Sequence, residues 1–514
     1  MHIDDSNNKI TWRHFQQNLQ KQSLLKSSKR RVLRKASLLL VMFLLVTSIA
    51  FAMHSFIPIL SSSISSLSKA AAIIGSTIKH TADFCEDLFF SDATDNLQKS
   101  SGSSQDEAGS KASGYLASLT GKIITKGNEP KSLTRQEIRE IIDPQHLINI
   151  KSNHFSIQKD GRQLTFDTTL DMKLQHFLTE KVEGFQPNDR GKPEIIAMVV
   201  MEPHTGKILA MTGFDNETPC LNPCTLGNYP AASIFKMVTA SAAVETCGYN
   251  PATTLYFNGG KYTLYKRQLK DTHNKYSSKV TFANAFAESI NPVFGKLGSI
   301  KLGGEILEEY ARSFGFNQQI DSDMPFNPGT ILITEDNTFQ WAEVASGFNK
   351  TTTISPLFGA MIASTLLNFG KTPVPSIVES VTDQSGSILY KRKSEVINSA
   401  VKPETARAVM TMMNKTITRG TARKSFRGFQ KDATLSKLNI GGKTGSLYNR
   451  EHTVKFDWFT GFCKENQGKE QIVVSVVVGH GKYIGTRASR YGRMIFTEYF
   501  NNFYALSSKQ SNNG

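Results

Sequence analysis

Ser233 and Lys236 have the residue types and the spacing for nucleophilic chemistry. They follow two alanines in a stretch that reads as the start of a helix. Positions i and i+3 share one face of a helix, so the Lys236 amine can reach the Ser233 hydroxyl. The N-terminus of a helix favours developing negative charge, and the same field with partial burial lowers the pKa of a lysine. A lysine base could therefore activate this serine without a histidine.

Ser-x-x-Lys spacing alone is a weak signal, because it occurs elsewhere without accompanying motifs. The other instances begin at Ser23, Ser66, Ser76 and Ser156. Downstream of Ser233 come Ser289-Ile290-Asn291 and then Lys443-Thr444-Gly445-Ser446, and Lys-Thr-Gly occurs once in the chain. Three elements in this order are a signature of penicillin-recognising acyltransferases.

The chain resembles the transpeptidase domain of bacterial penicillin-binding proteins from about Phe166 to about Leu506. Besides the three motifs, the resemblance rests on Thr168-Thr169-Leu170-Asp171, the stretch 202–210, Gly420-Thr421-Ala422 and the stretch 458–462. It implies an α/β fold in which an antiparallel sheet flanked by helices faces an all-helical lobe, with the active site at their junction. One departure is the stretch 345–349, which reads Ala-Ser-Gly-Phe-Asn where the family usually has Gly-Gln-Gly.

The resemblance also implies a substrate, the D-Ala-D-Ala end of a peptidoglycan stem peptide, and β-lactams as ligands. Ser233 would attack the penultimate carbonyl, Lys236 would take its proton, and Ser289 would relay a proton to the departing D-alanine. The backbone N–H groups of Ser233 and Ser446 would hold the oxyanion. The residues expected to bind the substrate are Asn291, Lys443, Thr444, Gly445 and Ser446. No cofactor is expected, and no cysteine or histidine spacing predicts a metal site.

Several alternatives stay open at this point. Lys443 could be an ordinary edge-strand lysine, and Ser289 and Asn291 could be turn formers. The function implied by the resemblance is a monofunctional D,D-transpeptidase. A D,D-carboxypeptidase, a β-lactamase-like hydrolase and a non-catalytic penicillin-sensing scaffold would share much of the same sequence.

The charge of the chain is concentrated at its N-terminus. The formal net charge is +16 over 514 residues, and residues 1–35 hold nine Lys or Arg against Asp4 and Asp5. No nucleic-acid-binding motif accompanies this tail, so no nucleic-acid partner is expected. Instead, the basic run ends where an apolar segment begins, which is typical of a positive-inside flank.

That apolar segment carries no Lys, Arg, Asp or Glu from Ala36 to Met53, which is long enough to span a bilayer. We expect an uncleaved single-pass anchor over residues 36–57 in the bacterial cytoplasmic (inner) membrane, with the catalytic domain outside the cytoplasm. A partnership with a cell-wall synthesis complex is possible on this expectation. The competing interpretation is a signal peptide, because Ala50-Phe51-Ala52 resembles a cleavage site.

The chain has five cysteines, which leaves one unpaired if disulfides form. Cys220 and Cys224 lie in one loop shortly before Ser233, and the sequence leaves open whether they are bonded. Cys247 and Cys463 are expected to be small core residues.

The predicted organisation is a basic tail (1–35), an anchor (36–57), a serine-rich linker (58–131), a small pedestal element (132–165), the transpeptidase domain (166–506) and a tail (507–514). Thr134 and Glu137 form a capping-box pattern that opens a helix over 135–142. Asp171 is the expected N-cap of a helix reaching about Val182.

Strands are expected over 195–201, 207–211, 438–446, 456–462 and 471–479, and a final helix over about 490–506. The chain between Ser233 and about Phe369 is expected to be mostly helical. One such helix would run from Thr281 to Leu297 and present Ser289 and Asn291 near its end, before Pro292.

Overall fold

The computed structural model describes residues 132–186 and 188–512. The predicted basic tail, anchor and serine-rich linker lie outside the described residues. Between residues 132 and 512, the described part of the chain contains no helix that is both long and apolar enough to cross a membrane.

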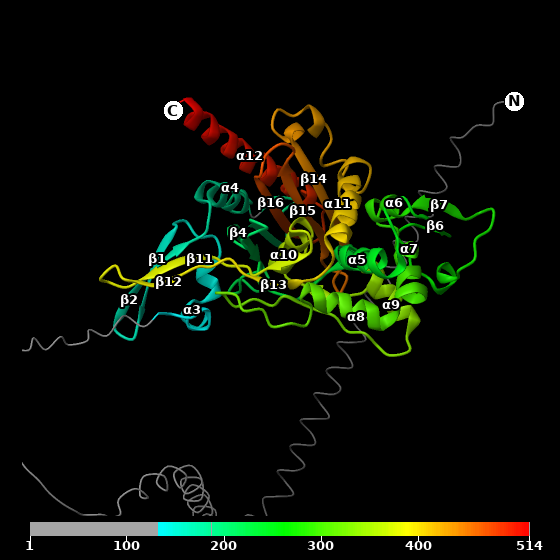
Figure 1. The fold of residues 1–514 in the computed structure, drawn as a ribbon, viewed down its shortest axis with the longest axis horizontal. Helices are drawn as coiled ribbons and strands as arrows, with labels where there is room; N and C mark the ends of the chain where they lie inside the picture. The colour runs from blue at the N-terminus through cyan, green and yellow to red at the C-terminus, as the bar shows by residue number, and fades with distance from the viewer. Residues whose placement is uncertain (1–131, 187, 513–514) are drawn as a thin grey trace, which may run out of the picture. The chain divides into compact units, whose positions relative to one another are not determined.

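The central element is a five-stranded antiparallel sheet with the strand order β14-β15-β16-β3-β4 (Figure 1). The strands are β3 (Ile195–Met201), β4 (Ile208–Asp215), β14 (Leu438–Tyr448), β15 (Lys455–Glu465) and β16 (Gln471–His480). Two of them come from the first half of the domain and three from its end, as predicted. β14, which carries Lys443, is an edge strand, so one side of its backbone is available to a partner.

Helices cover both faces of this sheet. α4 (Met172–Glu183) and α12 (Ala488–Asn512) pack on one face. α10 (Pro356–Leu367) and α11 (Pro403–Thr418) pack on the other. The predicted N-cap of α4 is confirmed, because the Asp171 carboxylate accepts from two N–H groups of the first turn of this helix.

The position of β3 inside the sheet explains why its sequence is apolar throughout. Side chains alternate between the two faces of a strand, so a strand covered on both sides has no polar face. Ile196, Met198 and Val200 belong to the hydrophobic cluster formed with α4 and α12. Ala197 and Val199 belong to the cluster on the opposite face.

The part of the chain between β4 and α10 is rich in helices and holds the serine motif. Its helices are α5 (Lys236–Cys247), α6 (Phe282–Ala287), α7 (Asn291–Lys296), α8 (Gly303–Phe314) and α9 (Thr338–Ser346). A π-helical segment, Leu297–Leu302, joins α7 to α8.

The single helix predicted from Thr281 to Leu297 is wrong. The helix ends after Ala287, Ser289 adopts a left-handed conformation with φ +57°, and a second helix begins at Asn291. Pro292 therefore starts a helix, where its missing N–H costs nothing, instead of following one.

Short strands also interrupt the stretch predicted as mostly helical. A hairpin joins β6 (Thr254–Phe257) to β7 (Ser278–Thr281). A small sheet joins β5 (Tyr229–Pro230), β9 (Thr353–Ile354) and β8 (Gly329–Thr330).

The N-terminal part of the described chain forms a second sheet. α3 (Arg135–Ile141) opens with the predicted capping box, in which Thr134 and Glu137 satisfy each other's backbone N–H groups. β1 (His154–Lys159) and β2 (Arg162–Thr168) then pair in a sheet of order β1-β2-β11-β12. The last two strands are β11 (Val378–Thr382) and β12 (Ile388–Lys391), and a separate pair consists of β10 (Lys371–Pro373) and β13 (Val396–Ser399).

Candidate active site

Ser233 lies in a 3-10 turn, Ala232–Phe235, that leads directly into α5. The predicted helix start is therefore confirmed, with the serine one turn ahead of the α-helix proper. The segment just before this turn is fixed to the central sheet, because the indole N–H of Trp458 on β15 donates to the carbonyl of Pro230 over 2.9 Å. Ala232 has φ +47°, which is unusual for a residue with a side chain and marks a tightly constrained turn.

The Lys236 amine is buried beside the Ser233 hydroxyl. Lys236 Nζ lies 2.9 Å from Ser233 Oγ, 2.8 Å from Asn291 Oδ1, and in contact with the carbonyl oxygen of Ser346. A neutral amine has two N–H groups and one lone pair. Asn291 and the Ser346 carbonyl can accept the two N–H groups, which leaves the lone pair to accept the Ser233 proton. This is the arrangement a general base requires.

The electrostatics favour the neutral amine. Burial, and secondly the charge of Lys443, hold the pKa of Lys236 well below its usual range. Burial also lowers the pKa of Lys443, to about 7. Among the described residues, no carboxylate forms an ion pair with either lysine.

Lys443 and Ser289 form a second hydrogen-bonded pair. Lys443 Nζ lies 2.9 Å from Ser289 Oγ and 2.8 Å from the carbonyl oxygen of Thr444. The left-handed turn between α6 and α7 holds Ser289 in this position. Asn291, which begins α7, donates from Nδ2 to the carbonyl of Tyr262 over 3.1 Å, and this fixes which of its atoms faces Lys236.

β14 runs past Ser233 at close range. A Cβ atom added to Gly445 would lie 3.2 Å from the backbone nitrogen of Ser233, so a glycine allows this approach. The hydroxyls of Thr444 and Thr421 contact each other. The Lys-Thr-Gly-Ser motif is thereby brought alongside the serine turn, with the backbone of both available to a ligand.

A cleft of about 710 Å³ joins these groups. Six of the eight predicted site residues line it: Ser233, Ser289, Asn291, Thr444, Gly445 and Ser446. The other two, Lys236 and Lys443, are fully buried beneath it and reach it through the serine hydroxyls. The structure thus brings together all eight residues from three distant parts of the sequence.

The sequence interpretation missed the stretch Ser346-Gly347. The Ser346 carbonyl contacts the Lys236 amine, and Gly347 has φ +63°. A Cβ atom on Gly347 would lie 1.8 Å from the carbonyl oxygen of Ala232, so only glycine fits there. The sequence did offer a signal for this stretch. Residues 345–349 depart from the family pattern but keep a glycine at position 347.

Asp457 was also missed, and it lies on β15 directly opposite Ser446. Its carboxylate accepts from the Ser446 hydroxyl over 3.1 Å and from the Ala488 backbone N–H over 2.9 Å. Burial alone would raise the pKa of Asp457, but His480, the Ala488 N–H and Arg487 outweigh it, so the net pKa is lowered. Asp457 is therefore an anion that holds β14 and the start of α12 together.

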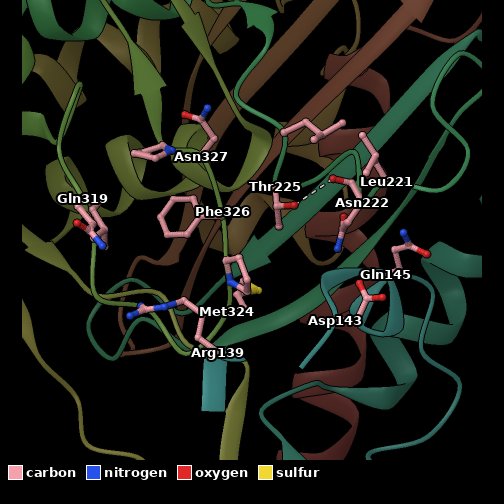
Figure 2. A pocket seen from close by; sticks show the side chains of 14 residues that line it. Arg139, Asp143, Gln145, Leu221, Asn222, Thr225, Gln319, Met324, Phe326 and Asn327 are labelled. Carbon is pink, nitrogen blue, oxygen red and sulfur yellow. Dashed lines mark hydrogen bonds between the residues drawn. The ribbon is translucent and has the colours of Figure 1, made fainter. Parts of the chain in front are cut away.

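Figure 2 shows a second pocket, whose volume is about 610 Å³. Its lining comes from α3, from Asp143 and Gln145 just after this helix, and from the chain segments 221–226 and 319–328. Among the described residues, Arg139 is the one cation that lines it, and its guanidinium already donates to Asp321 Oδ1 and to the Ser322 carbonyl. None of the eight predicted site residues lies in this pocket. Cys220 and Cys224, in and beside the same loop, are free thiols.

Curated relatives resemble this chain at modest identity. Stage V sporulation protein D of Bacillus subtilis is 23% identical over 308 residues, which is 58% of this chain and 46% of the relative. Peptidoglycan D,D-transpeptidase PbpA of Mycolicibacterium smegmatis is 25% identical over 374 residues, 65% of this chain and 71% of the relative. The chain spans about half the length of the first relatives it matches.

Solved structures share the fold. The crystal structure of PBPA from Mycobacterium tuberculosis aligns with a TM-score of 0.52 and 22% identity, covering 66% of this chain and 81% of that one. The family model described as the penicillin binding protein transpeptidase domain matches residues 196–504, which is more than half of the sequence. The chain therefore belongs to the penicillin-binding protein transpeptidase family.

Proposed function

We propose that this protein is a membrane-anchored, monofunctional serine D,D-transpeptidase that cross-links peptidoglycan stem peptides. The observation that carries the proposal is the buried Lys236 amine, 2.9 Å from Ser233 Oγ and aimed so that its lone pair can take the serine proton. The Lys443–Ser289 pair at the same cleft supplies the second proton path.

In the first step, Ser233 Oγ attacks the carbonyl carbon of the penultimate D-alanine and its proton moves to Lys236 Nζ. The backbone N–H groups of Ser233 and Ser446 stabilise the oxyanion. The hydroxyls of Thr444 and Thr421 hold the substrate's terminal carboxylate, and the Lys443 amine supplies positive charge from beneath the cleft. Asn291 positions the Lys236 amine and also the peptide amide of the substrate.

In the second step, the C–N bond to the terminal D-alanine breaks and its nitrogen takes a proton through the Ser289 hydroxyl. The Lys443 and Lys236 amines are the neighbouring proton sources.

In the third step, an acceptor amine from a second stem peptide attacks the acyl-serine carbonyl. The new peptide bond forms and the ester bond breaks, while the acceptor amine gives up a proton to Lys236 Nζ and Lys236 returns a proton to Ser233 Oγ.

The lining of the cleft favours transfer to an amine over hydrolysis. Rapid hydrolysis needs a base that holds a water molecule against the ester. The described residues that line the cleft include no aspartate or glutamate. The D,D-carboxypeptidase and β-lactamase alternatives are therefore less well supported than the transpeptidase.

Anchoring through residues 36–57, with the catalytic domain outside the cytoplasmic membrane, is part of the proposal and rests on the sequence. The relative PbpA is named a peptidoglycan D,D-transpeptidase, and this supports the substrate class.

Labelling by a fluorescent penicillin tests the proposal. The wild-type protein should be labelled covalently, and Ser233→Ala should abolish the label while melting at the same temperature. Ser385→Ala, in an exposed turn of the second sheet, is the matched control and should be labelled normally. Equal labelling of wild type and Ser233→Ala would show that another residue is the nucleophile.

A further inference from the structure

One end of the cleft carries positive charge that the proposed mechanism does not use. Lys350, His452 and Lys455, here called the basic rim, line the same cleft as Ser233. Lys350 Nζ lies 3.1 Å from His452 Nε2. Lys455 Nζ lies 5.4 Å from the ring centre of Tyr448, whose ring centre is 5.7 Å from that of His452. The two lysines and the imidazole are thus gathered around one aromatic side chain.

The charge of the basic rim is not neutralised within the described part of the chain. Neither Lys350 nor Lys455 has a carboxylate oxygen within ion-pair distance among the described residues, and the nearby Glu451 forms no ion pair with them. By contrast, Lys207, just before β4, and Lys391, on β12, share Glu379. A concave surface with unpaired charge of one sign attracts ligands of the opposite sign.

The position of the rim relative to β14 indicates which part of a ligand would meet it. Lys455 is paired with Tyr448 at the C-terminal end of β14, whereas Lys443 and Thr444 lie five and four residues earlier. A peptide whose terminal carboxylate binds at Lys443 and Thr444 can extend the sheet along the free edge of β14 in the antiparallel direction. Its chain then runs from the C-terminus toward Tyr448.

The distances fit the residue that precedes the D-Ala-D-Ala pair. A strand advances about 3.3 Å per residue, so Tyr448 lies roughly 7 Å beyond Ser446 along β14. A side chain with four or five carbons on that preceding residue can cover this distance. Phe348, Tyr262 and Tyr448 line the cleft with partly exposed rings, which suit the methylene part of such a side chain.

We propose that the basic rim selects donor peptides whose residue before D-Ala-D-Ala carries a free carboxylate at the end of its side chain. This inference rests on the proposed function, because it assumes that the donor binds along β14 with its terminal carboxylate at Lys443. The apolar stem of the side chain lies against Tyr448, and its carboxylate is held by Lys350 and Lys455. An amidated or amine-terminated side chain gains no such contact.

A matched pair of penicillins tests the proposal. One carries an adipoyl side chain that ends in a carboxylate, and the other carries the same chain ending in a carboxamide. The acyl side chain of a penicillin takes the place of the residue before D-Ala-D-Ala. The second-order rate constant of acylation should be about tenfold higher for the carboxylate, as charge-assisted hydrogen bonds imply. This ratio should fall as salt screens the rim.

The variants Lys350→Gln and Lys455→Gln, separately and together, should bring the ratio of the two rate constants toward one. Lys159→Gln removes the same charge from β1, outside the cleft, and should leave the ratio as in the wild type. A wild-type ratio near one, or a ratio that persists in the double variant, would overturn the proposal. If neither penicillin acylates the wild type, the proposed function itself fails, so the two failures are distinguishable.

Discussion

Lys236 illustrates how a single buried residue sets the chemistry of this site. It is fully buried, its amine contacts three oxygen atoms, and no described carboxylate balances its charge. The neutral form satisfies all three contacts while providing a lone pair for the Ser233 proton. Burial would normally be costly for an amine, and here the same burial makes it a base.

The rate of acylation should depend on pH through this amine. Lys236 is an effective base only when it is neutral, so the rate should rise as pH increases through its pKa and then level off. Because that pKa is held well below 10.5, the plateau should be reached well before pH 10. Lys236→Ala should lose about 10²- to 10⁴-fold in rate together with this pH dependence. A wild-type rate that still climbs at pH 10 would show a lysine with its ordinary pKa.

Asp457 should affect both stability and acylation. Asp457→Ala removes the acceptor for the Ser446 hydroxyl and for the buried Ala488 N–H, and leaving that buried N–H unsatisfied costs about 1–3 kcal/mol. We expect a lower melting temperature and slower acylation by a penicillin. Asp457→Asn keeps one acceptor oxygen and should recover part of both quantities. Acylation at the wild-type rate in Asp457→Ala would show that the position of Ser446 does not depend on this carboxylate.

At the scale of elements, the site depends on the loop after α9 fitting against the serine turn. Gly347→Ala should reduce acylation about a hundredfold or more, because its Cβ would displace the Ala232 carbonyl and with it Ser233. Gly248→Ala is the matched control: Gly248 has φ +65°, and its added Cβ meets nothing within 4 Å.

In both variants, the left-handed backbone conformation should lower the free energy of unfolding by about 1 kcal/mol, because alanine adopts it less readily than glycine. Only Gly347→Ala should also lose acylation. Thermal melting and the rate of penicillin acylation separate the two effects. Equal acylation in the two variants would mean that the contact between Gly347 and Ala232 does not position the nucleophile.

The elements that sequence predicts well are those whose pattern has one physical cause. The continuous apolar run of β3 and the capping residues Thr134 and Asp171 fall where expected. The predicted helix over 281–297 was wrong because its apolar spacing continues across a break that only the backbone of Ser289 reveals. The hairpin between β6 and β7 was missed because its short strands pair with each other and have little apolar pattern.

The predicted site residues all meet at one cleft, because each lies in a motif with a recognisable order. The groups that support them were not predictable in the same way. The Ser346 oxygen that contacts Lys236 is a backbone carbonyl, which any residue type supplies. The role of Asp457 depends on its register with Ser446 across two strands, and register is a tertiary property.

At the scale of the whole molecule, the predicted anchor over residues 36–57 would place the reaction outside the cytoplasmic membrane. A reporter enzyme fused after residue 60 should be active only outside the cytoplasm, and the mature protein should retain its basic N-terminal tail. Mass analysis of the purified N-terminus checks the second point. Recovery of a chain that begins at Met53 would show instead that Ala50-Phe51-Ala52 is a cleavage site.

The intact mass of the protein during reaction with penicillin tests the central claim most directly. Ser233 should attack the β-lactam carbonyl, and because the described lining of the cleft holds no carboxylate to activate water, the penicilloyl ester should persist for many minutes. We therefore expect one stable adduct whose added mass maps to the peptide containing Ser233. An adduct on another residue, or one that disappears within seconds as penicilloic acid accumulates, would contradict the account.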